Sequence, residues 1–189
     1  MQAEIIFAGF GGQGVLFAGQ ILAFAGMDWG KEVTWMPSYG PEMRGGTANC
    51  TVIIADEEIG SPLVRNPQAA VVMNIPSFDK YEPQVIKGGV LIVNASLVNR
   101  GITRKDVDGL LIPANEIAET IGNKRLTNMV MLGALLQKLP VLPPEAIEQA
   151  LEKHLPERHR RLLPSNITAL RQGAAFARGE LVVEGINPV

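Results

Sequence analysis

The sequence predicts an α/β protein, namely a three-layer α/β/α domain with a mostly parallel sheet. Two observations predict this fold. Valine-rich apolar runs of strand length alternate with longer helical patterns, as is typical of parallel sheets that helices cover on both faces. The first run also breaks into a glycine-rich turn followed by a helix, which makes the predicted domain Rossmann-like. A length of 189 residues with 47% hydrophobic residues fits one well-packed domain.

The strands and helices follow from the pattern in chain order. The predicted strands are residues 3–8, 32–36, 47–55, 69–73, 90–93 and 109–112. The predicted helices are residues 14–29, 77–86, 116–121, 126–139, 143–155 and 165–178. Ser77 is the expected N-cap of the second helix, and Gly88 and Gly89 are expected to end it. A short segment at 59–62 is expected to form an edge hairpin with 47–55, and the domain spans 1–179 with a tail at 180–189.

The most informative motif is the glycine loop, which we define as residues 9–14, GFGGQG. Gly9, Gly11 and Gly14 have the spacing of the dinucleotide fingerprint, and Gly12 and Gln13 complete the turn. A helix that begins after such a turn points N–H groups at one spot, which favours an anion such as phosphate. The alternative is a tight turn that only lets the strand and helix pack closely. A dinucleotide also needs a carboxylate after the second strand, and Glu32 opens that strand instead.

A second loop follows at 37–46, PSYGPEMRGG, in which Pro37 is expected to end regular structure. Ser38, Tyr39, Glu42 and Arg44 are its candidate contact residues for a ligand or a neighbouring subunit. Glu42 can accept a hydrogen bond, and Arg44 can bind a phosphate or carboxylate with two N–H groups. The alternative is that these two charges pair with each other or with a partner and fix the loop.

Composition excludes several classes of protein. A net charge of −2 and 5% aromatic residues argue against nucleic-acid binding, and no apolar run is long enough to cross a membrane. The single cysteine, Cys50, fits a buried position in a strand and cannot ligate a cluster, and a cytoplasmic location is expected. His154 and His159 fall in a basic segment that fits a solvated turn. No catalytic triad, P-loop lysine or metal-ligand cluster is present, so no catalytic or metal-binding residue is assigned.

The glycine loop, the second loop and the helix segment 127–133, TNMVMLG, together resemble the gamma subunit of 2-oxoacid:ferredoxin oxidoreductases. The resemblance covers residues 3–178. It implies a multi-subunit enzyme that converts a 2-oxoacid, coenzyme A and oxidised ferredoxin to acyl-CoA, CO2 and reduced ferredoxin. The expected partners are alpha and beta subunits, with a delta subunit as a further candidate.

The same resemblance places thiamine diphosphate, magnesium and the iron–sulfur clusters in partner subunits. It leaves the glycine loop either as a contact for the phosphates of coenzyme A or as a contact for a neighbouring subunit. The alternative function is a stand-alone nucleotide-binding protein, such as an NAD- or FAD-linked reductase or a ligand sensor.

Overall fold

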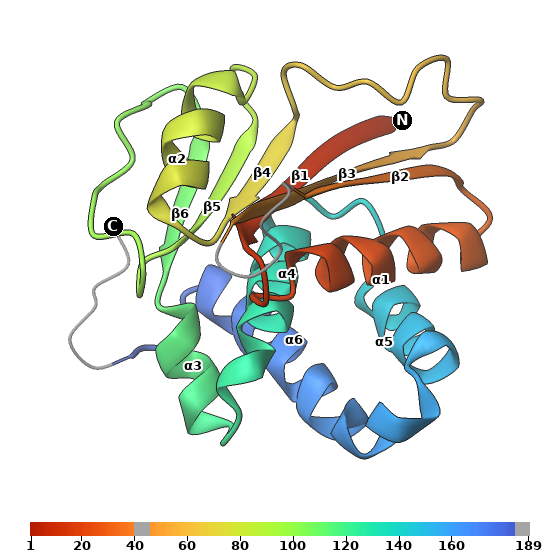
Figure 1. The fold of residues 1–189 in the computed structure, drawn as a ribbon, viewed down its shortest axis with the longest axis vertical. Helices are drawn as coiled ribbons and strands as arrows, with labels where there is room; N and C mark the ends of the chain where they lie inside the picture. Colours follow the sequence, from red (N-terminus) through yellow and green to blue (C-terminus); the bar gives the residue numbers. More distant parts are fainter. Residues whose placement is uncertain (40–45, 184–189) are drawn as a thin grey trace.

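The computed structural model describes residues 1–39 and 46–183, with the backbone alone at residue 39 (Figure 1). Six strands form one sheet in the order β2-β3-β1-β4-β5-β6. Their bounds are Gln2–Phe10 for β1, Glu32–Tyr39 for β2, Thr47–Ala55 for β3, Ala69–Val72 for β4, Val90–Asn94 for β5 and Asp108–Ile112 for β6. Three of the five pairings are parallel, which confirms the predicted α/β fold with a mostly parallel sheet.

Helices cover the two faces of the sheet unequally. Their bounds are Val15–Asp28 for α1, Ile75–Tyr81 for α2, Ala114–Thr120 for α3, Thr127–Lys138 for α4, Pro144–His154 for α5 and Leu163–Ala177 for α6. Three short 3-10 helices lie at Glu82–Gln84 (η1), Lys124–Leu126 (η2) and Glu157–Leu162 (η3). The larger core packs α1, α3, α4, α5 and α6 against one face, whereas α2 covers the other (Figure 1).

Helix α4 lies at the centre of the larger core. All residues from 127 to 136 are buried, as its apolar sequence predicts. Two glycines let α6 approach it closely, because a Cβ at Gly133 would collide with the carbonyl oxygen of Leu170, and a Cβ at Gly173 with that of Val130. The two helices therefore touch backbone to backbone.

Strand β2 is longer than the sequence predicts. It continues through Pro37 and Ser38 to Tyr39, although Pro37 was expected to end it. The strand lies at the edge of the sheet, where a residue without an N–H group need not break the ladder. The prediction failed because the sequence does not reveal that this strand has only one neighbour.

The predicted hairpin between 47–55 and 59–62 is wrong. Residues 59–62 form no strand, and β3 instead pairs antiparallel with both β2 and β1. Strand β3 therefore lies inside the sheet, and it runs opposite to the five other strands. Its four fully buried C-terminal residues fit this internal position.

The predicted cap of α2 is also wrong. The helix begins at Ile75, and its N-cap is Asn74, whose Oδ1 accepts a hydrogen bond from the N–H of Ser77 at 2.8 Å. Ser77 therefore donates a hydrogen bond to the cap residue and is not the cap itself. Helix α2 ends at Tyr81, and the segment continues as the 3-10 helix η1 before Gly88 turns with a φ of 76°.

Candidate functional site

The candidate site lies at the carboxyl edge, which we define as the edge of the sheet where β1, β4, β5 and β6 end. Strands β1 and β4 are neighbours, but the chain leaves β1 through α1 on one face and leaves β4 through α2 on the other. Such a switch point is where open α/β sheets form a ligand crevice. The glycine loop lies at this point, directly after β1.

The backbone of the glycine loop requires glycine at two positions. Gly12 has a φ of 94° and Gly14 a φ of 77°, both in the left-handed region that other residues rarely adopt. Asn128, at the start of α4, donates its Nδ2 to the carbonyl oxygen of Gly14 at 3.1 Å. A Cβ on Gly14 would approach that Nδ2 to 2.5 Å, so the loop and α4 are in close contact.

The side chain of Gln13 fills the inside of the turn. Its Oε1 accepts the N–H of Phe10 at 2.6 Å, and its Nε2 donates to the carbonyl oxygen of Met73 at 3.2 Å. Gln13 therefore joins the ends of β1 and β4. Gly9 is buried in β1 beneath it, where a Cβ would approach Gln13 Oε1 to 2.5 Å. The first fingerprint glycine thus permits packing and faces the interior.

Two N–H groups of the loop remain open. Gly11 donates to the carbonyl oxygen of Gly46 at 2.9 Å, but the N–H groups of Gly12 and Gly14 have no acceptor within residues 1–39 and 46–183. An adjacent cavity of about 490 Å³ is lined by the loop, the start of α1 and Ala48 of β3. Its lining is predominantly apolar, with Val15, Leu16 and Phe17 on the α1 side.

The second loop begins at the same edge. Ser38 pairs with Asn49, and Tyr39 pairs with Ala48, which lines the cavity. The end of β2 is therefore the direct neighbour of the strand that forms part of the cavity wall. The side chain of Ser38 is exposed. Glu42 and Arg44 lie outside the described residues, so their predicted contacts stay predictions.

The geometry does not favour a dinucleotide site of the usual form. Glu32 is at the start of β2, where it pairs with Ala55 at the opposite edge of the sheet. The last described residues of β2, Met36 to Tyr39, supply no carboxylate. Strand β3 also separates β2 from β1, so β2 does not occupy the position next to β1 that a ribose contact requires.

Sequence reasoning missed two amide residues at this edge. Asn128 fixes the glycine loop, and Asn74 caps α2; both are buried. The Nδ2 of Asn74 has no partner among the described residues. A signal for Asn128 existed, because a polar residue at the start of a helix that is otherwise apolar all round needs a hydrogen-bond partner.

The described part of the chain contains no group of three or more His, Cys, Asp or Glu side chains that could hold a metal ion. Cys50 is buried as predicted, and burial raises the pKa of its thiol to about 12, which makes it a poor nucleophile. No helix among the described residues is long and apolar enough to cross a membrane.

The fold and the site define an α/β domain with a Rossmann-like glycine loop at the switch point of its sheet. The family model described as pyruvate ferredoxin/flavodoxin oxidoreductase matches residues 4–176. The chain belongs to this family.

Individual relatives agree with the family. Ketoisovalerate oxidoreductase subunit VorA of Methanothermobacter thermautotrophicus is 36% identical over 94% of this chain, which spans only 37% of that protein's length. The 2-oxoglutarate synthase subunit KorC of Methanothermobacter marburgensis is 35% identical, with 98% of this chain and 99% of that subunit covered. The crystal structure of the keto/oxoacid ferredoxin oxidoreductase gamma subunit from Geobacter sulfurreducens superposes with a TM-score of 0.80 at 31% identity, over 94% of this chain and 99% of that one.

Proposed function

We propose that this protein is the gamma subunit of a multi-subunit 2-oxoacid:ferredoxin oxidoreductase. The complex would convert a 2-oxoacid, coenzyme A and oxidised ferredoxin to acyl-CoA, CO2 and reduced ferredoxin. The observation that carries this proposal is the end-to-end match with a 2-oxoglutarate synthase subunit of nearly the same length. In this assignment residues 1–179 form the domain, residues 180–189 form a tail, and the complex is cytoplasmic.

The other parts of the enzyme belong to partner subunits. Alpha and beta subunits, with a delta subunit as a further candidate, would carry thiamine diphosphate, magnesium and the iron–sulfur clusters, and ferredoxin would bind to the complex. The sequence supports this division, because one cysteine cannot supply the several thiolates that a cluster needs.

The glycine loop would bind a phosphate group of coenzyme A. The open N–H groups of Gly12 and Gly14 support this role, since both belong to a turn at the start of a helix, where backbone donors favour anions. Gly11 and Gln13 would hold the turn in shape, and Gly9 would let Gln13 pack beneath it. Ser38, Tyr39, Glu42 and Arg44 would contact either the ligand or a neighbouring subunit.

Purification of the native complex tests this proposal. We expect the chain to co-purify with subunits that carry thiamine diphosphate and iron–sulfur clusters, and the complex to oxidise a 2-oxoacid only when coenzyme A is present. Recovery of the chain from its native source as a stable monomer without partners would contradict the proposal.

The loop assignment has its own test in the same complex. An Arg44→Ala variant is expected to raise the KM for coenzyme A or to weaken subunit assembly, because it removes a bidentate donor. Unchanged assembly together with unchanged kinetics would remove Arg44 from the site.

A further inference from the structure

A second cavity, of about 350 Å³, lies beside the glycine loop and differs from the first in its charge. It shares Gly14 and Phe17 with the first cavity, but it extends toward η2, η3 and the start of α6. In Figure 1, α5 and α6 lie below α1. Its apolar floor consists of Phe17, Leu126, Leu155, Pro156 and Leu162.

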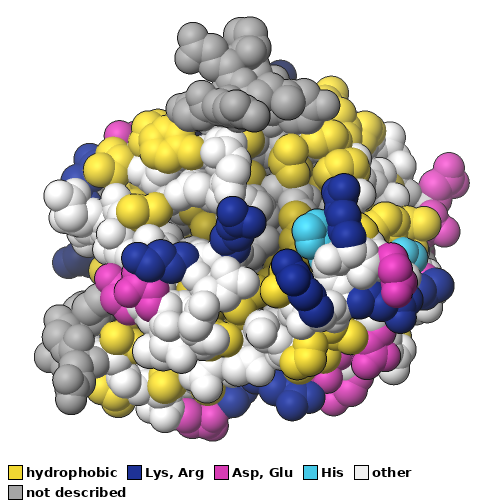
Figure 2. Space-filling model, turned by 60° about the horizontal axis from the view of Figure 1, so that its bottom comes forward, with side chains coloured by type: hydrophobic (Ala, Val, Ile, Leu, Met, Phe, Trp, Pro, Cys, Tyr) yellow, Lys and Arg dark blue, Asp and Glu magenta, His cyan; other side chains and the backbone are white. Residues whose placement is uncertain are grey.

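The rim of this cavity is cationic. Arg125, Arg158 and His159 line it, and its lining contains no Asp or Glu among the described residues. Figure 2 shows this face of the molecule, on which several Lys and Arg side chains lie near the histidines, with Asp and Glu side chains among them. The chain as a whole has a net charge of −2, so the positive charge here is a local feature.

Most neighbouring cations are already paired, whereas the two arginines on the rim are not. Lys153 pairs with Asp28 at 2.6 Å, and Arg160 pairs with Glu157 at 3.0 Å. Arg158 donates only its Nε–H, to Nε2 of His159 at 3.2 Å, which leaves its terminal amino groups without a partner in the described part of the chain. The guanidinium of Arg125 has no partner there either.

One helix, α1, has its N-terminus at this cavity. Its N-cap, Gly14, lines the cavity, and the helix has neither a side-chain cap nor an acidic residue in its first turn. Helices α4 and α6 instead continue from the 3-10 helices η2 and η3 without a break, so they add no free end here. Because the helix dipole acts mainly within the first turn, the start of α1 beside two open arginines favours an anion.

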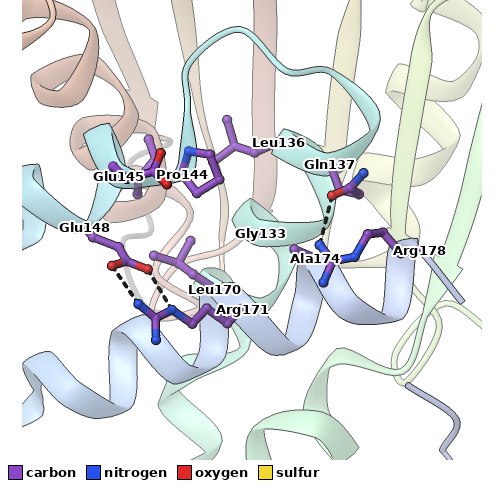
Figure 3. A pocket seen from close by; sticks show the side chains of 11 residues that line it. Gly133, Leu136, Gln137, Pro144, Glu145, Glu148, Leu170, Arg171, Ala174 and Arg178 are labelled. Carbon is purple, nitrogen blue, oxygen red and sulfur yellow. Dashed lines mark hydrogen bonds and ion pairs between the residues drawn. The ribbon is translucent and has the colours of Figure 1, made fainter. Parts of the chain in front are cut away.

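A third cavity also contains arginines, but their side chains are already paired. It is about 300 Å³ in volume and lies between α4, α5 and α6 (Figure 3). There Arg171 forms two hydrogen bonds to Glu148, at 2.8 and 2.9 Å, and Arg178 donates to Gln137 at 3.0 Å (Figure 3). Its arginines are therefore already occupied, whereas those of the second cavity are available to a ligand.

We propose that the cavity between η2, η3 and the first turn of α1 is a binding site for a phosphoryl group, held by Arg125 and Arg158. The phosphoryl group is either free or carried by a nucleotide whose base contacts the apolar floor. The site is separate from the proposed contact of the glycine loop with coenzyme A, because Arg125 and Arg158 line only this cavity, although Gly14 lines both.

Calorimetric titration of the full chain with inorganic pyrophosphate and, separately, with ADP tests the site. Saturable one-to-one binding is expected. Equal affinity for the two compounds would assign the site to the free anion, and tighter binding of ADP would assign it to a nucleotide. Absence of binding of both compounds at millimolar concentration by folded protein would overturn the proposal.

Three single variants locate the binding. Arg125→Ala and Arg158→Ala should each weaken binding by about tenfold or more, because each removes a charge-assisted hydrogen-bond donor. Both side chains are exposed, so the variants are expected to fold. Arg161→Ala is the matched control, since Arg161 is on the same 3-10 helix but does not line the cavity. Equal weakening by Arg161→Ala would show diffuse attraction instead of a site and would overturn the proposal.

Discussion

At the scale of single residues, two amide side chains determine the shape of the candidate site. Gln13 fills the glycine loop from inside, and Asn128 holds its end at Gly14. The sequence identified the glycines because their spacing is a known pattern. It did not identify Asn128, because the contact joins residues separated by 114 positions in the chain. The open donors of the loop likewise depend on which N–H groups the fold leaves unpaired.

Replacement of Gly14 tests this contact. Gly14→Ala is expected to lower the free energy of unfolding by about 2–4 kcal/mol, because it adds backbone strain at positive φ and a collision with Asn128. Denaturant unfolding measures the change. Gly12→Ala is the control, since its φ is also positive but the space around it is open, and it should cost only about 1–2 kcal/mol. Equal losses in the two variants would exclude a specific role for the Asn128 contact.

The buried thiol of Cys50 predicts a dependence of stability on pH. Burial raises the pKa of this thiol from 9.0 to about 12. Between these values the unfolded thiol loses its proton while the folded thiol keeps it, so the free energy of unfolding falls as the pH rises. The contribution is about 1.4 kcal/mol per pH unit.

Denaturant unfolding of the native chain and of Cys50→Ala, measured from pH 9 upward, isolates this contribution. The variant should show a shallower decline, because other titrating groups are common to both proteins. Parallel declines would show that Cys50 does not ionise on unfolding in this range.

At the scale of helices and strands, the sequence predicted the elements themselves more accurately than it predicted their order in the sheet. The helix at 127–138 and the strand at 47–55 follow from apolar patterns that the structure confirms. The placement of β3 between β2 and β1 could not be predicted. A strand that is buried on both faces has the same apolar sequence pattern whether it pairs in parallel or antiparallel. The extension of β2 through Pro37 depends on the same placement.

The crossing of α4 and α6 gives a prediction at this scale. Gly173→Ala should lower the free energy of unfolding by about 2 kcal/mol or more, although alanine raises helix propensity by about 1 kcal/mol. The reason is the collision of the new Cβ with the carbonyl oxygen of Val130. Thr168→Ala, at an exposed position of α6, is the control and should leave stability nearly unchanged. An increase in stability for Gly173→Ala would contradict the backbone contact.

At the scale of the whole molecule, the carboxyl edge carries exposed apolar side chains. Phe10 at the end of β1 and Ile75 at the start of α2 are each 37% exposed. Under the proposed function, a partner subunit covers this edge, because apolar side chains next to a candidate site commonly mark an interface.

Substitution of Phe10 tests this arrangement. Phe10→Asp is expected to reduce co-purification of the partner subunits, because it places a charge where apolar contact is expected. Leu63→Asp is the control, since Leu63 is 78% exposed in the β3–β4 connection, and it should leave assembly intact. Size-exclusion chromatography of the co-expressed complex measures both. Normal assembly of Phe10→Asp would place the interface elsewhere.

The glycine contact between α4 and α6 has a consequence for synthesis of the protein. Helix α4 is buried all round, and α6 supplies much of its cover from residues 163–177, which follow it in the sequence. While the ribosome is still making these residues, the face of α4 that α6 covers is exposed. The larger core therefore closes only after residues 163–177 have left the ribosome, and until then the nascent chain exposes a surface of the kind that chaperones bind.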